Sequence, residues 1–335
     1  MRRVVVTGIG LISPLGANQD ETWHGALNAK NVTTQIPSKW KDYSKFDSTL
    51  WAPLPDNLFE KLSISRVDKL QFDPATLLAL SATQEAISNA RLVVRVNERN
   101  FFVEGIDSEI ASVYLGTGIG GSFSFQSNHA FQYAHRSKQD LDRLNSSNKL
   151  LILDKTINRL VMPARFNPLA VSQVMPNASA AAIGIRYGLK GTNRTICSAC
   201  ASGTVAIGLA YESIREGRSH FVISGGTEYL YDDCGGIYKS FDIANTLSKS
   251  NNPETANCPF DVKRTGFLFS EGGAAILILE DLQHAMNRNA PIIAEIIGYE
   301  ENSDAHNMVS PEKSGIQLEK LYNSLFYHAE IAADE

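Results

Sequence analysis

A cysteine among small residues is the side chain in this sequence best suited to covalent chemistry. Cys200 lies in the stretch Thr195-Ile-Cys-Ser-Ala-Cys-Ala-Ser-Gly-Thr-Val-Ala-Ile-Gly208. The apolar pattern of residues 201–216 predicts a largely buried helix, so the thiol falls at a helix N-terminus. Unpaired backbone N–H groups and the positive end of the helix dipole favour a thiolate there. Cys200 is therefore a candidate nucleophile.

Two other interpretations of Cys200 stay open on these residues alone. A cysteine in a turn of small residues is commonly a buried packing residue. Cys197 and Cys200 also spell C-x-x-C, the spacing of a thioredoxin-like redox pair, although such a pair belongs early in a short βαβ unit and this one lies near mid-chain. Ser202 and Gly203 favour the nucleophile, because a substrate carbonyl could approach the backbone closely beside them.

Composition excludes several classes of protein. The 335 residues are 43% apolar and 20% charged, which is typical of a soluble globular protein with one large or two medium cores. The net charge of -5 gives no general attraction to nucleic acid or to an anionic membrane, so neither is an expected partner. The apolar runs fall short of the roughly 18 residues that a spanning helix needs. Four unevenly spaced cysteines form no disulfide framework.

The N-terminus superficially resembles a signal peptide. Arg2 and Arg3 precede an apolar run, but Gly8, Gly10 and Pro14 interrupt that run and no small-residue cleavage site follows. We therefore expect a cytoplasmic protein.

Two glycine-rich segments match parts of nucleotide-binding motifs. Gly8-Ile-Gly10 is half of the dinucleotide fingerprint G-x-G-x-x-G, and residues 11–16 do not complete it. Gly116-Thr-Gly-Ile-Gly-Gly121 follows a predicted strand but lacks the Lys-Ser/Thr pair of a phosphate-binding loop. We expect no cofactor and no metal ion, and we assign the second segment to close backbone packing beside another site.

Strand and helix patterns alternate along the chain, which predicts an α/β protein with a buried, largely parallel sheet. A first strand at 2–7 is expected to turn at Gly8, and Asp20 to cap the helix that follows. Residues of about 32–74 and 127–163 are predicted excursions, the first a polar and aromatic surface segment. The other expected strands lie at 110–115, 220–224, within 259–280 and at 291–299, and the other expected helices at 74–89, 177–188, 282–288 and 316–329.

Six segments occur in an order that is far more specific than any one of them. They are Val4-Val-Val-Thr-Gly-Ile-Gly10 with Ser13-Pro-Leu-Gly16, Gly116-Thr-Gly-Ile-Gly-Gly121, Ser198-Ala-Cys-Ala-Ser-Gly203, Ser224-Gly-Gly-Thr-Glu228, Pro259-Phe-Asp261 with Arg264-Thr-Gly-Phe267 and Glu271-Gly272, and Ser303-Asp-Ala305 with Ser310-Pro311. With this set, the chain resembles the β-ketoacyl-acyl-carrier-protein synthases, the elongating ketosynthases of fatty acid and polyketide assembly.

The resemblance implies a thiolase-like fold, in which two similar halves stack as α-β-α-β-α layers, usually as a homodimer. Residues 1–255 would form the N-terminal half, which carries the cysteine, and residues 256–335 would begin an incomplete C-terminal half. The implied partners are an acyl carrier protein, with acyl- and malonyl-phosphopantetheine arms, and a second copy or a ketosynthase-like chain.

The resemblance also implies the chemistry. Cys200 would take an acyl group from a carrier-protein thioester, and a malonyl-carrier protein would then decarboxylate, so that its carbanion extends the chain. The Cys200 amide matches one oxyanion donor of the family, and covalent catalysis of this kind splits a difficult C–C bond formation into two steps. Ile119 and Phe241 match residues beside the family's acyl channel and gate, and both could equally be plain core residues. Met308 is a further expected substrate-binding residue.

This sequence also departs from the family. The H-G-T-x-T, K-x-x-x-G-H and G-F-G-G segments that supply two catalytic histidines and an oxyanion donor are absent. His306 matches a segment near the pocket, and His328 is expected to be a solvated residue. One alternative is a ketosynthase whose last portion is carried elsewhere, making fatty acids, polyketides or polyenes. The other is a non-condensing homologue or a partner subunit resembling a chain-length factor, although such factors usually replace the cysteine.

Overall fold

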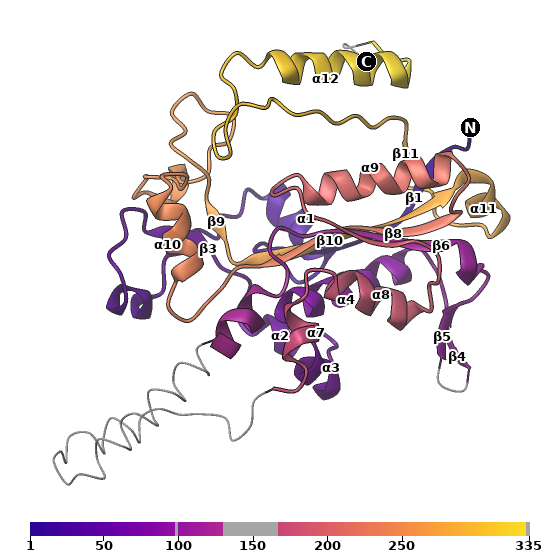
Figure 1. Cartoon of the computed structure of the whole chain (residues 1–335), viewed down its shortest axis with the longest axis horizontal. Coiled ribbons are helices and arrows are strands. Elements are labelled where there is room, and N and C mark those ends of the chain that lie inside the picture. Colours follow the sequence, from indigo (N-terminus) through magenta and orange to yellow (C-terminus); the bar gives the residue numbers. More distant parts are fainter. Residues whose placement is uncertain (98–99, 130–166, 333–335) are drawn as a thin grey trace, which may run out of the picture.

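The structure is a computed structural model that describes residues 1–97, 100–129 and 167–332 (Figure 1). Its centre is a six-stranded sheet with the order β11-β1-β10-β8-β6-β7. In chain order these strands are β1 (Val4–Ile12), β6 (Ala111–Gly116), β7 (Asn193–Ile196), β8 (Phe221–Tyr229), β10 (Gly272–Asp281) and β11 (Ala294–Ile296).

The sheet is mixed, so the expectation of a largely parallel sheet was wrong. β6 pairs in parallel with β7 and β8, but β10 pairs antiparallel with both β1 and β8, and β11 pairs antiparallel with β1. Strands that alternate with helices along the sequence indicate parallel pairing. That alternation does not indicate that β10, from far along the chain, lies between β1 and β8. β10 also makes the sheet continuous across the domain boundary expected between residues 255 and 256, which itself stays a prediction.

Helices cover both faces of this sheet (Figure 1). α4 (Pro74–Asn89) and α8 (Ala178–Tyr187) pack on one face, and α9 (Ser202–Arg215) packs on the other. α4 has the bounds that the sequence predicted, because Pro74 occupies its first turn and the Asp73 carboxylate accepts a 2.9 Å hydrogen bond from the Ala75 N–H. These layers form one α-β-α half of the expected stacked fold.

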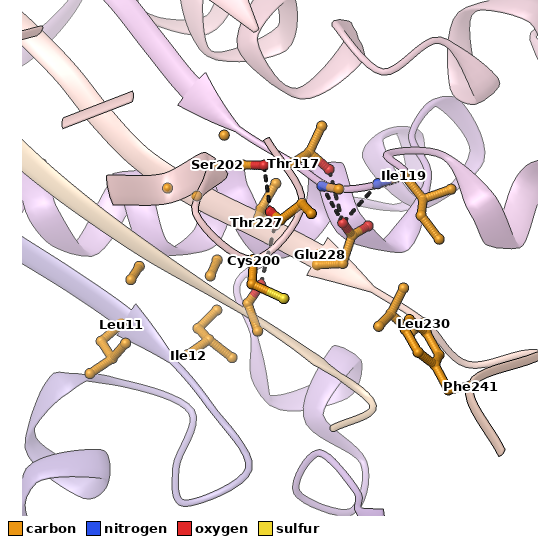
Figure 2. A pocket seen from close by; sticks show the side chains of 18 residues that line it. Leu11, Ile12, Thr117, Ile119, Cys200, Ser202, Thr227, Glu228, Leu230 and Phe241 are labelled. Carbon is orange, nitrogen blue, oxygen red and sulfur yellow. Dashed lines mark hydrogen bonds between the residues drawn. The ribbon is translucent and has the colours of Figure 1, made fainter. Parts of the chain in front are cut away.

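The first predicted excursion contributes to a second core. β2 (Thr34–Gln35), β3 (Leu50–Ala52) and β9 (Phe269–Ser270) form a three-stranded sheet. Trp40 is fully buried against Tyr238, and Trp51 is 5% exposed, so the expected surface segment is wrong for these two aromatic residues. Their partners lie far along the chain. One of them is on α10 (Gly236–Ile243), which also carries Phe241 beside Leu230 (Figure 2).

The remaining elements are short or peripheral. α1 (Gln19–Leu27) is capped by Asn18, whose side-chain oxygen accepts a 2.8 Å bond from the Glu21 N–H, and not by Asp20 as predicted. Of the second predicted excursion, only residues 127–129 are among those described. The other α-helices and strands of the described ranges are α2 (Leu58–Lys61), α3 (Arg66–Gln71), β4 (Val94–Asn97), β5 (Asn100–Val103), α7 (Ala170–Val174), α11 (Leu282–Asn287) and α12 (Ile316–Ala329).

No helix within the described ranges has the length and apolar content needed to cross a membrane. The expected cytoplasmic location stays a prediction.

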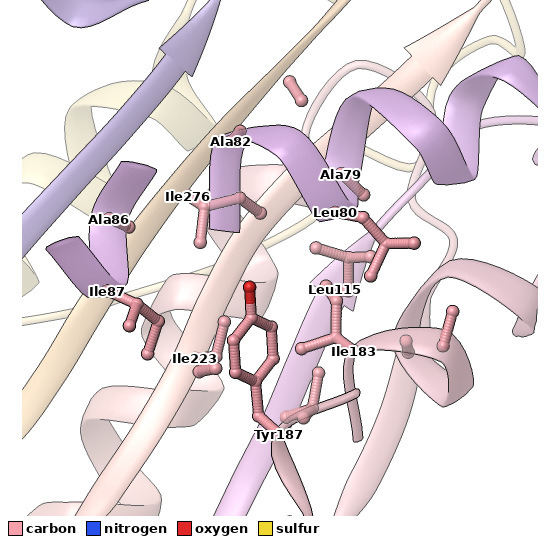
Figure 3. Close-up of a cluster of buried hydrophobic side chains, with 14 of the residues drawn as sticks. Ala79, Leu80, Ala82, Ala86, Ile87, Leu115, Ile183, Tyr187, Ile223 and Ile276 are labelled. Atoms are coloured by element: carbon pink, nitrogen blue, oxygen red, sulfur yellow. The ribbon is translucent and has the colours of Figure 1, made fainter. Parts of the chain in front are cut away.

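The main core lies between the sheet and the helices α4 and α8. α4 faces the strands with three small side chains, those of Ala79, Ala82 and Ala86. The ring of Tyr187 at the end of α8 lies between Ile223 of β8 and Ile183 of α8 (Figure 3). These side chains are buried, and longer side chains of both helices, among them Leu80 of α4 and Ile183 of α8, fill the rest of this face.

Gly8 and Gly10 lie inside β1 and do not form the turn that the sequence predicted. A Cβ on Gly8 would lie 2.2 Å from the Ala86 carbonyl oxygen, and one on Gly10 would lie 1.8 Å from the Ala82 carbonyl oxygen. Both distances are far below van der Waals contact, so these glycines let the backbone of α4 lie directly on β1.

Gly10→Ala is expected to lower the free energy of unfolding by about 2 kcal/mol or more, because the added methyl group must push α4 away from β1. Gly236→Ala is the matched control, since a Cβ there would lie 3.8 Å from the nearest atom, the Asp232 Oδ1. Urea unfolding followed by circular dichroism measures both variants. Equal stability of the two variants would contradict this account of the α4–β1 contact.

Candidate active site

A cavity of about 520 Å³ opens beside the start of α9 and the ends of the central strands (Figure 2). It brings together three of the residues predicted from the sequence: Cys200, Ile119 and Phe241. Apart from Glu228, the other lining residues are small or apolar: Leu11, Ile12, Gly116, Thr117, Gly118, Ala199, Ser202, Gly203, Gly226, Thr227, Leu230, Gly273, Ala274 and Ala275.

Cys200 lies in a tight turn just before α9, as the sequence predicted. Ala199 has φ +47°, a left-handed conformation that non-glycine residues rarely adopt. The Ser202 hydroxyl accepts a 2.8 Å bond from the Ser198 N–H and donates a 2.6 Å bond to the Ala199 carbonyl oxygen. Ser202 therefore closes the turn from the inside and holds the exposed Cys200 thiol at the start of the helix.

Three glycines determine how closely the start of α9 approaches the sheet. A Cβ on Gly116 of β6 would lie 2.2 Å from the Ser202 carbonyl carbon, and one on Gly226 of β8 would lie 3.1 Å from the Cα of Gly203. Any larger residue would lift the helix and the preceding turn. The position of the Cys200 thiol relative to the cavity floor thus depends on backbone packing.

Glu228 holds the glycine-rich loop that follows β6. Its carboxylate accepts hydrogen bonds from the N–H groups of Gly118 (2.5 Å), Ile119 (2.9 Å) and Gly120 (3.2 Å), and from the Thr117 hydroxyl at 3.3 Å (Figure 2). Burial raises the pKa of this carboxyl above its ordinary value, and the bonds from the three amides oppose that rise. The loop therefore surrounds a half-buried acid.

The sequence indicated no role for Ser202 beyond its small size, and it indicated no role for Glu228. A serine in the first turn of a helix is a recognisable signal for local backbone bonds. The bonds of Glu228 reach a loop some 110 residues earlier, and no local pattern indicates them.

Ile119 and Phe241 form two apolar parts of the cavity wall. Ile119 is 47% exposed at the tip of the loop held by Glu228. Phe241 of α10 packs edge-on against Phe267 and Phe269, with ring centroids 5.5 and 5.9 Å away. These contacts hold the Phe241 ring between the second core and the cavity wall.

Met308 does not line this cavity. Its side chain is fully exposed on the segment 297–315, which forms no helix or strand. The segment packs on α9 further along that helix, through Tyr299 at Gly208 and through Ile297 at Tyr211. Its role in substrate binding stays a prediction.

The remaining candidates for chemistry also lie outside the cavity or face away from it. His306 is exposed and His328 pairs with Glu300 on the molecular surface. The Cys197 thiol donates a 3.2 Å bond to the Gly118 carbonyl oxygen, and both it and the Cys200 thiol are free, so no disulfide joins the C-x-x-C pair. Within the described ranges, no three His, Cys, Asp or Glu side chains gather as metal ligands would.

Comparison with known proteins identifies the family. The family model of the β-ketoacyl synthase N-terminal domain matches residues 1–285. The chain belongs to the β-ketoacyl synthase family. A mitochondrial protein of Schizosaccharomyces pombe assigned as a 3-oxoacyl-acyl-carrier-protein synthase is 31% identical over 94% of this chain and 67% of its own length. The 3-oxoacyl-acyl-carrier-protein synthase 2 of Staphylococcus aureus is 30% identical over 94% and 66%. The chain thus spans about two thirds of the length of these relatives.

Solved structures show the same fold. A β-ketoacyl synthase from Burkholderia phymatum is 27% identical, with a TM-score of 0.75 over 100% of this chain and 72% of that one. Two more distant structures share the fold alone. One is the ishigamide ketosynthase/chain length factor, 23% identical with a TM-score of 0.76 over 100% and 71%. The other is a type II polyketide ketosynthase in complex with its acyl-carrier protein, 24% identical with a TM-score of 0.75 over 99% and 71%. The expected thiolase-like α/β fold is therefore confirmed.

Ser202→Ala is expected to slow the alkylation of Cys200 by iodoacetamide, because the turn loses two hydrogen bonds of about 1 kcal/mol each and samples other conformations. The rate should fall several-fold, and the unfolding midpoint should fall no further than in a control variant that loses a buried serine hydroxyl elsewhere in α9. Peptide mapping by mass spectrometry measures the rate at Cys200.

Ser213→Ala provides the control for this variant, since Ser213 is a buried serine of the same helix whose hydroxyl bonds Ser219 at 3.0 Å, away from the cavity. Equal alkylation rates in the two variants would show that Ser202 does not hold the turn.

Proposed function

We propose that Cys200 is the acyl-carrying nucleophile of a β-ketoacyl synthase, an acyltransferase of fatty acid or polyketide/polyene biosynthesis. The observation that carries this proposal is the position of the Cys200 thiol, in a strained turn before α9 and at the edge of a largely apolar cavity of about 520 Å³. Membership of the family supports it.

The proposed acyl transfer needs few groups. The Cys200 thiolate attacks the thioester carbonyl carbon, and a new S–C bond forms as the carbonyl oxygen becomes an oxyanion. The backbone N–H of Cys200 is the proposed donor to that oxyanion. Collapse of the intermediate breaks the original S–C bond and releases the phosphopantetheine thiolate of the carrier protein, which takes up a proton from water. The acyl chain then lies in the cavity beside Ile119 and Phe241.

The donor of the acyl group is proposed to be an acyl carrier protein. A ketosynthase of the same fold has been solved in complex with its acyl-carrier protein, which supports a carrier as partner. Decarboxylative condensation with the malonyl-carrier protein is assigned to histidine and lysine segments that these 335 residues do not contain.

A second candidate function is a non-condensing homologue or partner subunit that is only acylated at Cys200. The observation in its favour is that His306 and His328, the histidines nearest in sequence to the expected catalytic segments, do not line the cavity.

Incubation with an acyl-carrier-protein thioester is expected to acylate Cys200 slowly, because the helix N-terminus favours the thiolate and one oxyanion donor is in place. Malonyl-carrier protein should release no carbon dioxide above a boiled control. Intact mass, peptide mapping and radiolabelled carbon dioxide measure these outcomes.

Cys200→Ala should abolish the acylation. Modification at Cys197, Cys234 or Cys258 in place of Cys200 would refute the assignment of the nucleophile, and carbon dioxide release would refute the assignment of condensation to other residues.

We also propose that the chain forms a homodimer, or a heterodimer with a ketosynthase-like chain, through β7. This strand is at the edge of the sheet, and its residues Asn193 and Arg194 are exposed. The carbonyl oxygens of Thr192 and Ile196 bond the segment Val113–Thr117, so by alternation the N–H of Thr195 points to the open edge. An unpaired edge of this kind is a template for a strand of another chain.

Thr195→Pro is expected to weaken association, because proline removes an outward N–H that a partner strand would use, while an edge strand tolerates it. Thr195→Val keeps that N–H and is the control. Sedimentation velocity over a range of concentrations measures association. A wild-type chain that stays monomeric at all concentrations, or equal association of both variants, would rule out this interface.

A further inference from the structure

Four hydrogen bonds converge on Glu228 from consecutive residues, 117 to 120. One carboxylate oxygen accepts bonds from the Thr117 hydroxyl and from the N–H groups of Gly118 and Ile119, and the other accepts the Gly120 N–H. A carboxylate can accept this many bonds without donating any, whereas a neutral amide would turn an N–H group towards a donor. The loop therefore fits an ionised acid.

The backbone of the loop is adapted to this acid. A Cβ on Gly118 would lie 2.9 Å from the Glu228 Oε2, so glycine allows the main chain to approach the carboxylate. Gly120 has φ +81° and a Cβ there would lie 2.8 Å from the Cα of Pro176. The loop thus has a conformation that few sequences allow, and Glu228 supplies the bonds that stabilise it.

The same loop forms two contacts with the candidate active site. It presents the half-exposed side chain of Ile119 to the cavity. Its Gly118 carbonyl oxygen accepts the bond from the Cys197 thiol, three residues before Cys200. Figure 2 shows Glu228 beneath the loop, with Ile119 on the side away from Cys200.

We propose that Glu228 is a positioning residue that sets the preference of the cavity for acyl-chain length. It acts through the loop 117–120, which places Ile119 against the chain bound beside Cys200. This inference rests on the proposed function, since the chain in question is the acyl group carried by Cys200.

The selectivity can be measured without a carrier protein. Cys200 displaces iodide from iodoacetamide and from its N-octyl derivative, and the ratio of the two alkylation rates reports how well the cavity holds an alkyl chain. Glu228→Gln should lower the octyl preference about fivefold, the equivalent of one lost hydrogen bond of about 1 kcal/mol. The rate with iodoacetamide itself should change much less.

Two further variants separate positioning from general loosening of the fold. Glu271→Gln is the matched control, because Glu271 is a half-buried acid that accepts bonds from the Leu54 N–H (2.8 Å) and the Tyr229 hydroxyl (3.2 Å) outside the cavity. It should leave the octyl preference unchanged. In an Ile119→Ala background, Glu228→Gln should have little further effect, since Glu228 acts through Ile119.

An unchanged octyl preference in folded Glu228→Gln overturns the proposal, as does the absence of any octyl preference in the wild type. Thr117→Val removes one of the four donors and replaces Glu228→Gln if that variant fails to fold; its preference should fall by less, and no fall overturns the proposal. Failure of acyl transfer from a carrier thioester would refute the proposed function alone, because the alkylation ratio does not depend on it.

Discussion

Two helices lie so close to the central sheet that glycine is the residue that fits between their backbones and the strands. On one face, Gly8 and Gly10 of β1 receive the carbonyl oxygens of α4. On the other, Gly116 and Gly226 receive the first turn of α9. The cavity lies at the second of these contacts, so its shape depends on main-chain packing that side-chain motion cannot relax.

The geometry around Cys200 is then completed by polar groups from separate parts of the chain. Ser202 closes the turn locally, whereas Glu228 reaches across to the loop after β6 and Cys197 joins that loop to the turn. The left-handed backbone at Ala199 is unfavourable by itself, and these surrounding bonds maintain it. The site is a junction of three segments, the ends of β6, β7 and β8.

Local patterns predicted local features well. The bounds of α4 and α12 were found to the residue and those of α9 to within one residue, because periodicity and caps act over a few residues. The order of strands was not predictable in this way: β10 inserts between β1 and β8 from far along the chain, and the glycines of β1 have a packing role that looks like a turn in the sequence. The buried Trp40 was missed for the same reason, since its partners are remote.

The candidate site residues were also predictable only in part. The helix start among small residues indicated Cys200, and the resemblance to a family added Ile119 and Phe241; the structure places all three around one cavity. Ordered motifs can locate such residues because they carry information about distant contacts. The structure does not place Met308 at this cavity, because its side chain is fully exposed on the segment 297–315. Ser202 and Glu228 are part of those motifs, but their hydrogen bonds could be identified only from the structure.

The pairing of β1 also has a consequence for the order of events during synthesis. Within the sheet, β1 is hydrogen-bonded to β10 and β11. Residues 4–12 therefore cannot pair with their strand partners until residues 272–296 have been synthesised. At typical elongation rates, that interval is about 15 to 50 s, during which the first strand has no strand partner on the nascent chain. The large loop must also be closed before the contact is gained, which slows folding. β1 is thus synthesised before the other strands of the sheet and is among the last to be paired in it, and α4 is the element that can shield it in the meantime.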